Sequence, residues 1–257
     1  MCGIVGTVDF HEFWPDRESF LRQGCAAIAS RGPDAEGFWC DGPAAFGHRR
    51  LSIIDLDSGA QPMQDPTGRY CITFNGEIYN YRELRNELEA KGFAFRTKSD
   101  TEVILNAYAS WGTGCLQRFN GIFAFGLWDA VERVLLRARD HLGVKPLLYA
   151  ITRDRLMFAS DLAALENAEG VDNRIDQAAL SDYLSLGYVL SLKTILRGVR
   201  KLEPGSFLKY EHGRPTIAPL LGPGCRSKRT DTHVSIRRSW RRGSFRNNRP
   251  RGDCAKW

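Results

Sequence analysis

Several short segments of the chain either alternate apolar and polar residues or hold brief apolar runs. None of them has an apolar stripe at helical spacing, and many are bounded by Gly, Pro, Asn or Asp, which are typical of turns. These patterns predict β-strands over residues 3–10, 37–41, 44–54, 70–74, 121–128, 131–138, 146–151, 155–159 and 206–210.

Other segments repeat their apolar positions every three or four residues, as the buried face of an amphipathic helix does. This spacing predicts helices over residues 17–30 and 176–186. Two further helices begin at sequences typical of a capping box, Asn80-x-x-Glu83 and Ser99-x-x-Glu102, in which both side chains bond free N–H groups of the first turn. We expect these two helices over residues 81–91 and 99–111.

The predicted strands occur in hairpin-like groups, with the helices clustered between the groups. This order favours an α+β fold with antiparallel sheets over the regular βαβ alternation of a dinucleotide-binding fold. With 257 residues, 43% of them hydrophobic, the chain can form one large domain or one domain with an appendage.

Targeting signals and cysteine pairs are not apparent. The longest apolar run, residues 121–128, is too short to span a bilayer, and no basic segment followed by an apolar one marks a secretory signal. The seven cysteines include no CxxC pair and no His/Cys cluster at zinc spacing. We therefore expect a reduced, cytoplasmic protein.

The net charge of +6 comes from one end of the chain. Residues 222–257 contain 11 Lys and Arg but 2 Asp and Glu, which leaves the remaining residues with 25 basic and 28 acidic side chains. This tail could bind nucleic acid through Arg and Trp, could be disordered, or could be an out-of-frame translation product. The tail has no apolar period, and the sequence changes to it abruptly. Because a shift of reading frame would produce such a switch to Arg-rich sequence without pattern, we favour the out-of-frame origin over nucleic-acid binding.

Cys2 directly follows the initiator methionine. After removal of Met1, one residue would carry both a thiol and a free α-amine, and α-amines titrate near neutral pH, with reference pKa values of roughly 7.7–8.0. Such a residue can be nucleophile and base at once. The alternative is a small hydrophobic residue at the start of a buried strand.

Seven motifs follow one another along the chain. They are Cys2-Gly3-Ile4-Val5-Gly6, Arg31-Gly32-Pro33-Asp34-Ala35-Glu36-Gly37, His48-Arg49-Arg50-Leu51-Ser52-Ile53-Ile54-Asp55, Phe74-Asn75-Gly76-Glu77-Ile78-Tyr79-Asn80, Ser99-Asp100-Thr101-Glu102, Phe119-Asn120-Gly121-Ile122-Phe123-Ala124-Phe125 and Ala138-Arg139-Asp140-His141-Leu142-Gly143-Val144-Lys145-Pro146-Leu147. In this order they resemble the glutaminase domain of the glutamine-hydrolysing asparagine synthetases, which are class II glutamine amidotransferases. The resemblance covers residues 2–217.

The resemblance implies a four-layer αββα sandwich, the N-terminal nucleophile hydrolase fold, and hydrolysis of glutamine to glutamate and ammonia. Cys2 would attack the side-chain amide, and Asn75 and Gly76 would donate hydrogen bonds to the oxyanion that forms. In isolation, Asn75-Gly76 is more typical of a turn.

The resemblance also implies a set of substrate-binding residues. Arg50 would hold the α-carboxylate of glutamine, Glu77 and Asp100 its α-ammonium group, and backbone groups of Leu51, Ile53 and Ile54 would line the substrate. The alternatives are a surface cation for Arg50 and a helix-capping carboxylate for Asp100.

In the family a second domain activates aspartate with ATP, and its glycine- and serine-rich pyrophosphate loop is not found in this sequence. We expect residues 1–170 to be the glutaminase domain, 171–217 a remnant of the linker and the start of the synthetase domain, and 218–257 a disordered or out-of-frame tail. The glutaminase half would need no cofactor or metal, whereas ATP and magnesium would serve the synthetase half, which we expect to be missing by truncation. Its partners would be glutamine and a separate synthetase chain, with no membrane.

Two other interpretations remain open. The chain could be the glutaminase domain of a related amidotransferase that modifies a sugar, a peptide or a polysaccharide. It could also be a non-catalytic regulatory module that retains the fold and recruits a synthetase.

Overall fold

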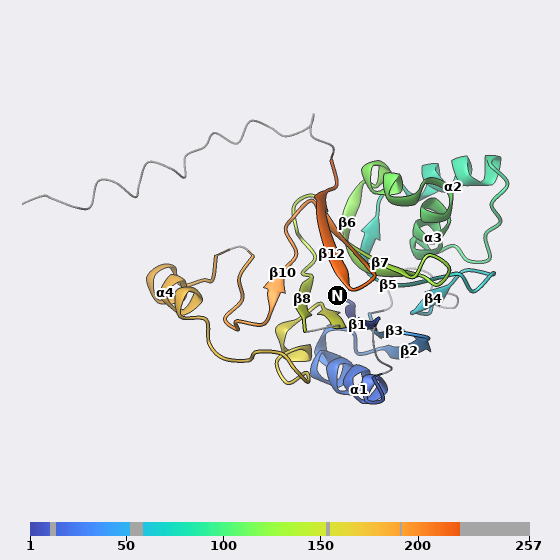
Figure 1. Ribbon diagram of the computed structural model, residues 1–257. Coiled ribbons are helices and arrows are strands. Elements are labelled where there is room, and N and C mark those ends of the chain that lie inside the picture. The colour runs from blue at the N-terminus through green and yellow to red at the C-terminus, as the bar shows by residue number, and fades with distance from the viewer. Residues whose placement is uncertain (11–13, 52–58, 153–154, 191, 222–257) are drawn as a thin grey trace, which may run out of the picture. The chain divides into compact units, whose positions relative to one another are not determined.

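The computed structural model describes residues 1–10, 14–51, 59–152, 155–190 and 192–221. Two antiparallel sheets of six strands each form the centre of the fold (Figure 1). The first has the order β10-β8-β9-β1-β3-β2, with β1 Gly3–Asp9, β2 Ala35–Asp41, β3 Ala44–Arg50, β8 Leu148–Ile151, β9 Arg155–Ala159 and β10 Arg200–Lys201. The second has the order β12-β11-β7-β6-β5-β4, with β4 Met63–Gln64, β5 Tyr70–Ile78, β6 Gly121–Asp129, β7 Val134–Arg139, β11 Ser206–Glu211 and β12 Arg214–Pro219.

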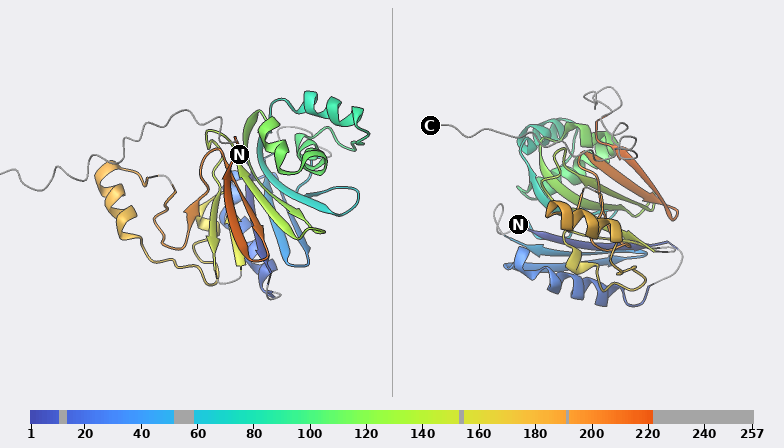
Figure 2. Two further views of the ribbon diagram at one scale, coloured as in Figure 1. Left: turned by 45° about the horizontal axis from the view of Figure 1, so that its top comes forward. Right: turned by 90° about the vertical axis from the view of Figure 1, so that its left-hand side faces the viewer.

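Helices cover the outer faces of the two sheets (Figure 2). The helix α1 Arg17–Ala27 packs on β1 and β3, whereas α3 Asp100–Trp111 packs on β5 and carries α2 Tyr81–Ala90 beside it. Short 3-10 turns span Ala29–Arg31, Gly112–Arg118 and Leu162–Ala164. The order helix, sheet, sheet, helix confirms the predicted four-layer αββα sandwich.

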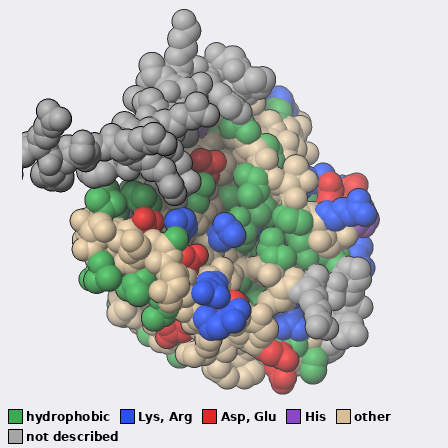
Figure 3. Space-filling view, turned by 60° about the vertical axis from the view of Figure 1, so that its left-hand side comes forward, with side chains coloured by type: hydrophobic (Ala, Val, Ile, Leu, Met, Phe, Trp, Pro, Cys, Tyr) green, Lys and Arg blue, Asp and Glu red, His purple; other side chains and the backbone are tan. Residues whose placement is uncertain are grey.

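The helix α4 Gln177–Leu186 lies to one side of both sheets (Figures 1 and 2). It begins at Asp176, whose carboxylate accepts hydrogen bonds from the N–H groups of Ala178 and Ala179, and it ends at Gly187 with φ 77°. Hydrophobic side chains gather on the face of the molecule that comes forward with α4 (Figure 3).

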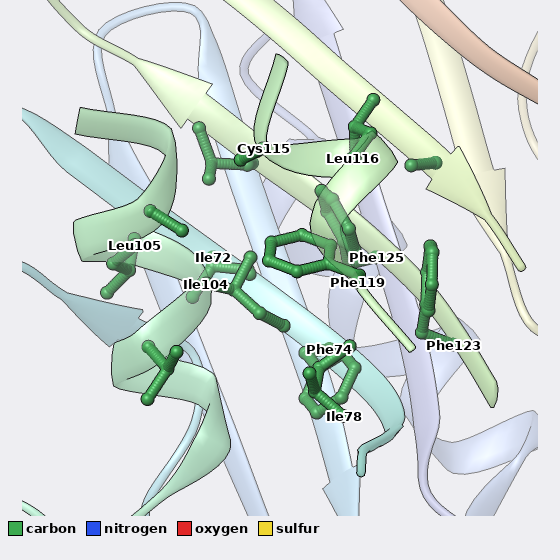
Figure 4. Close-up of a cluster of buried hydrophobic side chains, with 14 of the residues drawn as sticks. Ile72, Phe74, Ile78, Ile104, Leu105, Cys115, Leu116, Phe119, Phe123 and Phe125 are labelled. Atoms are coloured by element: carbon green, nitrogen blue, oxygen red, sulfur yellow. The ribbon is translucent and has the colours of Figure 1, made fainter. Parts of the chain in front are cut away.

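Three hydrophobic clusters fill the spaces between the layers. The largest lies between the second sheet and its helices, where Phe119, Phe123 and Phe125 meet Ile104 and Leu116 (Figure 4). A second cluster lies between the sheets and includes Ile4, Phe46, Trp128, Phe158 and Tyr210. A third lies between α1 and the first sheet and includes Val5, Leu21, Cys25 and Met157. The strands β1, in the first sheet, and β6, in the second, therefore have both faces buried.

The ends of several elements differ from the prediction. The strand β3 ends at Arg50, and the predicted continuation to residue 54 enters the range 52–58, outside the described residues. The strand β5 is longer than predicted, because it continues through Asn75, Gly76 and Glu77 to Ile78. The short strands β4, β10 and β12 were not predicted, since two-residue strands and an exposed edge strand have little apolar pattern.

Neither predicted capping box forms in full. The Asn80 side chain makes no capping bond; it donates to the carbonyl oxygen of Arg118 and accepts from the N–H of Asn120, tying the start of α2 to the chain before β6. At the other helix, Ser99 accepts from the N–H of Thr101 as a cap should, but Glu102 accepts from the N–H groups of Arg96 and Thr97 and not from that of Ser99.

Residues 171–219 contribute strands to both sheets of the same compact unit. The strand β10 pairs with β8, and β11 pairs with β7 along its whole length. This unit extends from Met1 to Leu221, so the predicted division at residue 170 does not mark its limit. The predicted tail lies beyond Leu221, outside the described residues apart from its first positions. None of the described helices has the length and apolar composition needed to span a bilayer.

Candidate active site

A pocket of about 190 Å³ lies where the N-terminus, the end of β3, the middle of β5 and the start of α3 meet. Its lining includes seven of the predicted site residues, Cys2, Arg50, Leu51, Asn75, Gly76, Glu77 and Asp100. Ile53 and Ile54, the other two, lie outside the described residues. The structure thus brings together side chains from four separate parts of the sequence.

The pairing of two strands positions Cys2. Because β1 runs antiparallel to β3 with Gly3 opposite Arg49, the residue before Gly3 lies next to the end of β3. There the Leu51 N–H donates to Cys2 Sγ at 3.4 Å, and the thiol lies 3.6 Å from the Leu51 carbonyl oxygen. Arg31 Nε donates to the Cys2 carbonyl oxygen at 3.4 Å. The sulfur is held against the backbone at the pocket wall.

Asn75 is buried in β5 with its side-chain amide at the same pocket. It is 1% exposed, and its Nδ2 has no hydrogen-bond partner among the residues that the structure describes. A buried amide donor without a partner carries a desolvation penalty of about 1–3 kcal/mol, which a ligand's oxygen would relieve. The interpretation of Asn75-Gly76 as a turn is wrong, since both lie within a strand.

Position 76 requires glycine because the neighbouring strand β6 lies close to it, with Phe123 opposite Gly76. A Cβ atom at position 76 would come within 2.7 Å of Phe123 Cα and would overlap the carbonyl oxygen of Ile122. Only glycine fits here, so the wall of the pocket beside Asn75 is bare backbone.

Hydrogen bonds between the sheets fix β5 next to Asn75. His48 Nε2, on β3, donates to the Phe74 carbonyl oxygen at 3.1 Å, and Thr73 Oγ1 donates to the carbonyl oxygen of Gly47 at 3.3 Å. Burial lowers the pKa of His48 to about 4, so the imidazole is neutral near pH 7. From the other side, Gln61 Oε1 accepts from the Phe74 N–H at 2.6 Å.

Two carboxylates meet at the start of α3. Asp100 is 6% exposed, and its Oδ2 accepts from the N–H of Ile78 at 3.0 Å. Burial, with a smaller contribution from the nearby charge of Glu77, raises the pKa of Asp100 to about 6, although the hydrogen bond from the Ile78 N–H opposes the rise. Both residues line the pocket, where a cationic group would relieve their repulsion. Arg50, at the end of β3, gives the same pocket an anion-binding group.

Lys145 also lines the pocket, and its chemistry was not predicted from the sequence. Its backbone is fixed on both sides, because its N–H donates to Asp140 Oδ2 at 3.0 Å and its carbonyl oxygen accepts from Arg139 Nε at 2.8 Å. The buried Asp140 also accepts from the N–H groups of Leu142 and Val144. The motif around Arg139-Asp140 is therefore a structural turn, and it also presents Lys145 to the site.

Met1 lines the pocket as well, and it is 54% exposed. Elsewhere in the described chain, no three His, Cys, Asp or Glu side chains are grouped as metal ligands would be.

Relatives of this chain are known. A family model described as a glutamine amidotransferase domain matches residues 1–219. The asparagine synthetase [glutamine-hydrolyzing] 1 of Bacillus subtilis (strain 168) is 44% identical over 80% of this chain and 33% of its own length. The asparagine synthetase [glutamine-hydrolyzing] 3 of the same organism is 37% identical over 82% of this chain and 35% of its own length. The chain spans about a third of the length of these curated relatives.

A solved structure supports the fold. The glutamine phosphoribosylpyrophosphate amidotransferase of B. subtilis, complexed with ADP and GMP, superposes with a TM-score of 0.61 over 86% of this chain and 50% of that one, at 19% identity. The family model covers most of the chain, and the fold agrees with that of a solved amidotransferase. The chain belongs to the glutamine amidotransferase domain family.

Proposed function

We propose that this chain hydrolyses the side-chain amide of glutamine to glutamate and ammonia, with Cys2 as the nucleophile after Met1 has been removed. The observation that carries the proposal is the buried Asn75 Nδ2, which has no hydrogen-bond partner among the described residues and lies in the pocket that also holds the Cys2 thiol. A donor without a partner beside a nucleophile suits an oxyanion that exists only during the reaction.

The first half of the reaction acylates the enzyme. The Cys2 α-amine takes the thiol proton, and the sulfur adds to the δ-carbon of glutamine, so that the amide oxygen becomes an oxyanion. Asn75 Nδ2 and the Gly76 N–H donate to this oxygen. When the intermediate collapses, the C–N bond breaks and the α-ammonium returns its proton to the departing ammonia. A γ-glutamyl thioester on Cys2 remains.

The second half releases glutamate. Water, activated by the same α-amine, adds to the thioester carbon, and the oxyanion again forms next to Asn75. The C–S bond then breaks, and the thiolate recovers a proton from the α-ammonium group. Glutamate leaves with Cys2 regenerated, so protons and electrons balance over the cycle.

The remaining charges of the pocket suit the amino-acid end of glutamine. The planar guanidinium of Arg50 can bind the α-carboxylate in a bidentate manner. The carboxylates of Glu77 and Asp100 can hold the α-ammonium group. A pocket that binds both the α-carboxylate and the α-ammonium group prefers an amino acid to a simple amide.

We further propose that the ammonia supplies an asparagine synthetase reaction. The relatives with 37–44% identity carry this name, and two-thirds of their length has no counterpart in the present match. ATP and magnesium would act in that synthetase half, and the glutaminase chemistry above needs neither.

The test is to incubate Met1-free protein with glutamine and to measure glutamate and ammonia. Cys2→Ala should abolish both products, whereas Cys40→Ala, which alters an exposed cysteine on β2, should leave them unchanged. Turnover that survives Cys2→Ala would contradict the proposal and favour a non-catalytic module with a contaminating glutaminase.

A further inference from the structure

The proposed function does not use one of the charges in the pocket. Four charged side chains line it: Arg50, Glu77, Asp100 and Lys145. In the proposed complex, Arg50 binds the α-carboxylate of glutamine, and the two carboxylates bind its α-ammonium group. Lys145 is left over, and it has no ion pair with any residue that the structure describes.

The strand register places Lys145 at the same level as Cys2. Ala159 of β9 pairs with Val5 of β1 on one side and with Leu148 of β8 on the other, so β1 and β8 run in the same direction. Cys2 lies three residues before Val5, and Lys145 lies three residues before Leu148. Two strand spacings amount to about 10 Å, a gap that the long, flexible side chain of lysine can narrow.

The chain just before Lys145 lies beside the proposed oxyanion donors. The N–H of Asp140 donates to the carbonyl oxygen of Phe123 at 2.8 Å, and Phe123 pairs with Gly76. From there the chain crosses from the second sheet to the first, where it enters β8. Lys145 therefore lies between the nucleophile Cys2 and the donor Gly76 along this crossing.

The turn that carries Lys145 is held by two side chains. Asp140, which is 1% exposed, accepts from the N–H groups of Val144 and Lys145 at 2.9 and 3.0 Å. Arg139 donates from Nη2 to the carbonyl oxygen of Gly143 at 2.7 Å and from Nε to that of Lys145 at 2.8 Å. A fixed backbone restricts where the ammonium group can lie, and a charge that is already in place costs no reorganisation during a reaction.

We propose that Lys145 is the cation of the reacting end of the pocket. Its ammonium group favours the neutral, basic form of the α-amine of processed Cys2, and it stabilises the negative charge that forms on the sulfur and on the amide oxygen of glutamine. This inference rests on the proposed function, because it assigns a role within that reaction. A cation disfavours a second cation nearby and favours an anion, so one charge has both effects.

The other charges around Cys2 are balanced by partners. Five more charged side chains of the described chain line the pocket, contact Cys2 or pair with one that does: Arg31, Arg50, Glu77, Asp100 and Asp161. Arg31 donates to the Cys2 carbonyl oxygen, but its guanidinium also lies 3.7 Å from Asp161. The other three would be occupied by the two charged groups of bound glutamine. In that complex, Lys145 is the charge that faces the reacting atoms without a counter-ion.

The direct experiment is an NMR titration of the Cys2 α-amine in Met1-free protein labelled with ¹⁵N-cysteine, without glutamine. Only Cys2 then has a free amine as its cysteine nitrogen, since the other cysteine nitrogens are amides. We expect Lys145→Met to raise the titration midpoint by about 0.5–1 pH unit. Lys145→Arg should keep the wild-type midpoint. Lys209→Met, which removes a lysine of β11 that does not line the pocket, should keep it too.

Kinetic measurements give a second readout. In Lys145→Met, kcat for glutamine hydrolysis should fall about tenfold near pH 7, because the transition state loses a nearby positive charge. The acidic limb of its kcat profile, which reports the base in the enzyme–glutamine complex, should move to higher pH. KM should change less, since other residues bind the amino-acid end. Lys145→Arg should restore most of kcat.

An unchanged midpoint in Lys145→Met would overturn the inference. A kinetic loss confined to KM would also overturn it, because Lys145 would then bind glutamine in its ground state. Lys145 is partly exposed, so its variants should fold, and unfolding curves verify this. A shifted midpoint in a protein that hydrolyses no glutamine would refute the proposed function, whereas hydrolysis with an unchanged midpoint would refute the role of Lys145 alone.

Discussion

The imidazole of His48 in one sheet donates from Nε2 to the Phe74 carbonyl oxygen in the other, across 3.1 Å of buried space. Phe74 precedes the proposed oxyanion donor Asn75, and His48 lies two residues before the proposed carboxylate-binding Arg50. One hydrogen bond therefore links the two walls of the pocket. We regard His48 as a positioning residue that contacts no substrate.

Replacing His48 should separate this positioning role from a chemical one. His48→Leu leaves the Phe74 carbonyl unpaired, and we expect kcat for glutamine hydrolysis to fall about tenfold or more, because a small displacement of Asn75 weakens the oxyanion contact. His48→Gln, which keeps a donor, should recover part of the rate. Equal activity in all three proteins would contradict the positioning role.

The same histidine should make stability depend on pH. Its folded pKa, about 4, lies below the 6.5 of an unperturbed imidazole, so the unfolded chain binds more protons between these values. Stability is therefore lost as pH falls from about 6.5 to 4, by up to about 3 kcal/mol at 1.36 kcal/mol per pKa unit. Urea unfolding of the wild type and of His48→Gln across this pH range measures the free energy of unfolding of each protein. The difference between the two free energies should narrow as pH falls. A constant difference would contradict the burial effect.

Asp100 should control glutamine affinity at low pH. Its folded pKa of about 6 means that the carboxylate becomes protonated below that pH and can no longer neutralise an α-ammonium group. We expect KM to rise as pH falls below about 6, and we expect Asp100→Asn to raise KM near pH 7 without this dependence. Asp176→Ala is the control, because it removes the carboxylate cap of α4 outside the pocket and should reduce stability but not affinity. If Asp100→Asn behaves like Asp176→Ala, the carboxylate of Asp100 is only a helix cap.

Asn75→Ala should affect the chemical step. Loss of one oxyanion donor typically lowers kcat by about 10²–10³-fold, and KM should change much less. Asn80→Ala, which removes an amide that bonds Arg118 and Asn120 and does not line the pocket, is a matched control and should keep kcat. If Asn75→Ala instead changed only KM, by weakening substrate binding, the amide would contact glutamine before the reaction, and the oxyanion role would be contradicted.

Replacement of the buried Arg137 by an apolar residue should stabilise the protein. It is fully buried in β7, and none of its side-chain nitrogens has a hydrogen-bond partner among the described residues, although its guanidinium lies 4.7 Å from the ring of Tyr149. Burial lowers its pKa to about 9, which reflects the unfavourable transfer of the charge from water. Arg137→Met should raise the free energy of unfolding by about 1–4 kcal/mol. Arg137→Lys should not, and a destabilised methionine variant would reveal an unseen partner for the guanidinium.

The strand and helix patterns predicted an α+β fold with antiparallel sheets, whereas the four-layer sandwich was implied by the family resemblance. The segment 121–128, apolar on both faces, is largely buried, and so is the apolar stripe of the helix predicted over 17–30. The patterns could not predict β4, β10 or β12, since strands this short or exposed depend on pairing with distant strands. The pair Asn75-Gly76 is another case in which local sequence does not decide the structure. Its residues are typical of a turn, but they lie in a strand because β5 pairs with β6 over nine residue positions.

The site residues were predicted largely from the order of the motifs along the chain. The structure adds the contacts that hold these residues in place. Gln61 and His48 act on the backbone of Phe74 from opposite sides, and the turn around Asp140 delivers Lys145 to the pocket. These relationships join residues 13 to 26 positions apart in the case of β5, and no local pattern encodes them. The helix α4, in contrast, was predicted, but the exposure of its apolar side chains Leu184 and Leu186 was not.

The most direct test of the central claim is mass spectrometry of Met1-free protein that has been mixed with glutamine and quenched within one turnover. We predict a mass increase of one γ-glutamyl group, located by peptide mapping on Cys2 and absent from protein that retains Met1. An adduct on another cysteine, or equal turnover with Met1 still attached, would contradict the account.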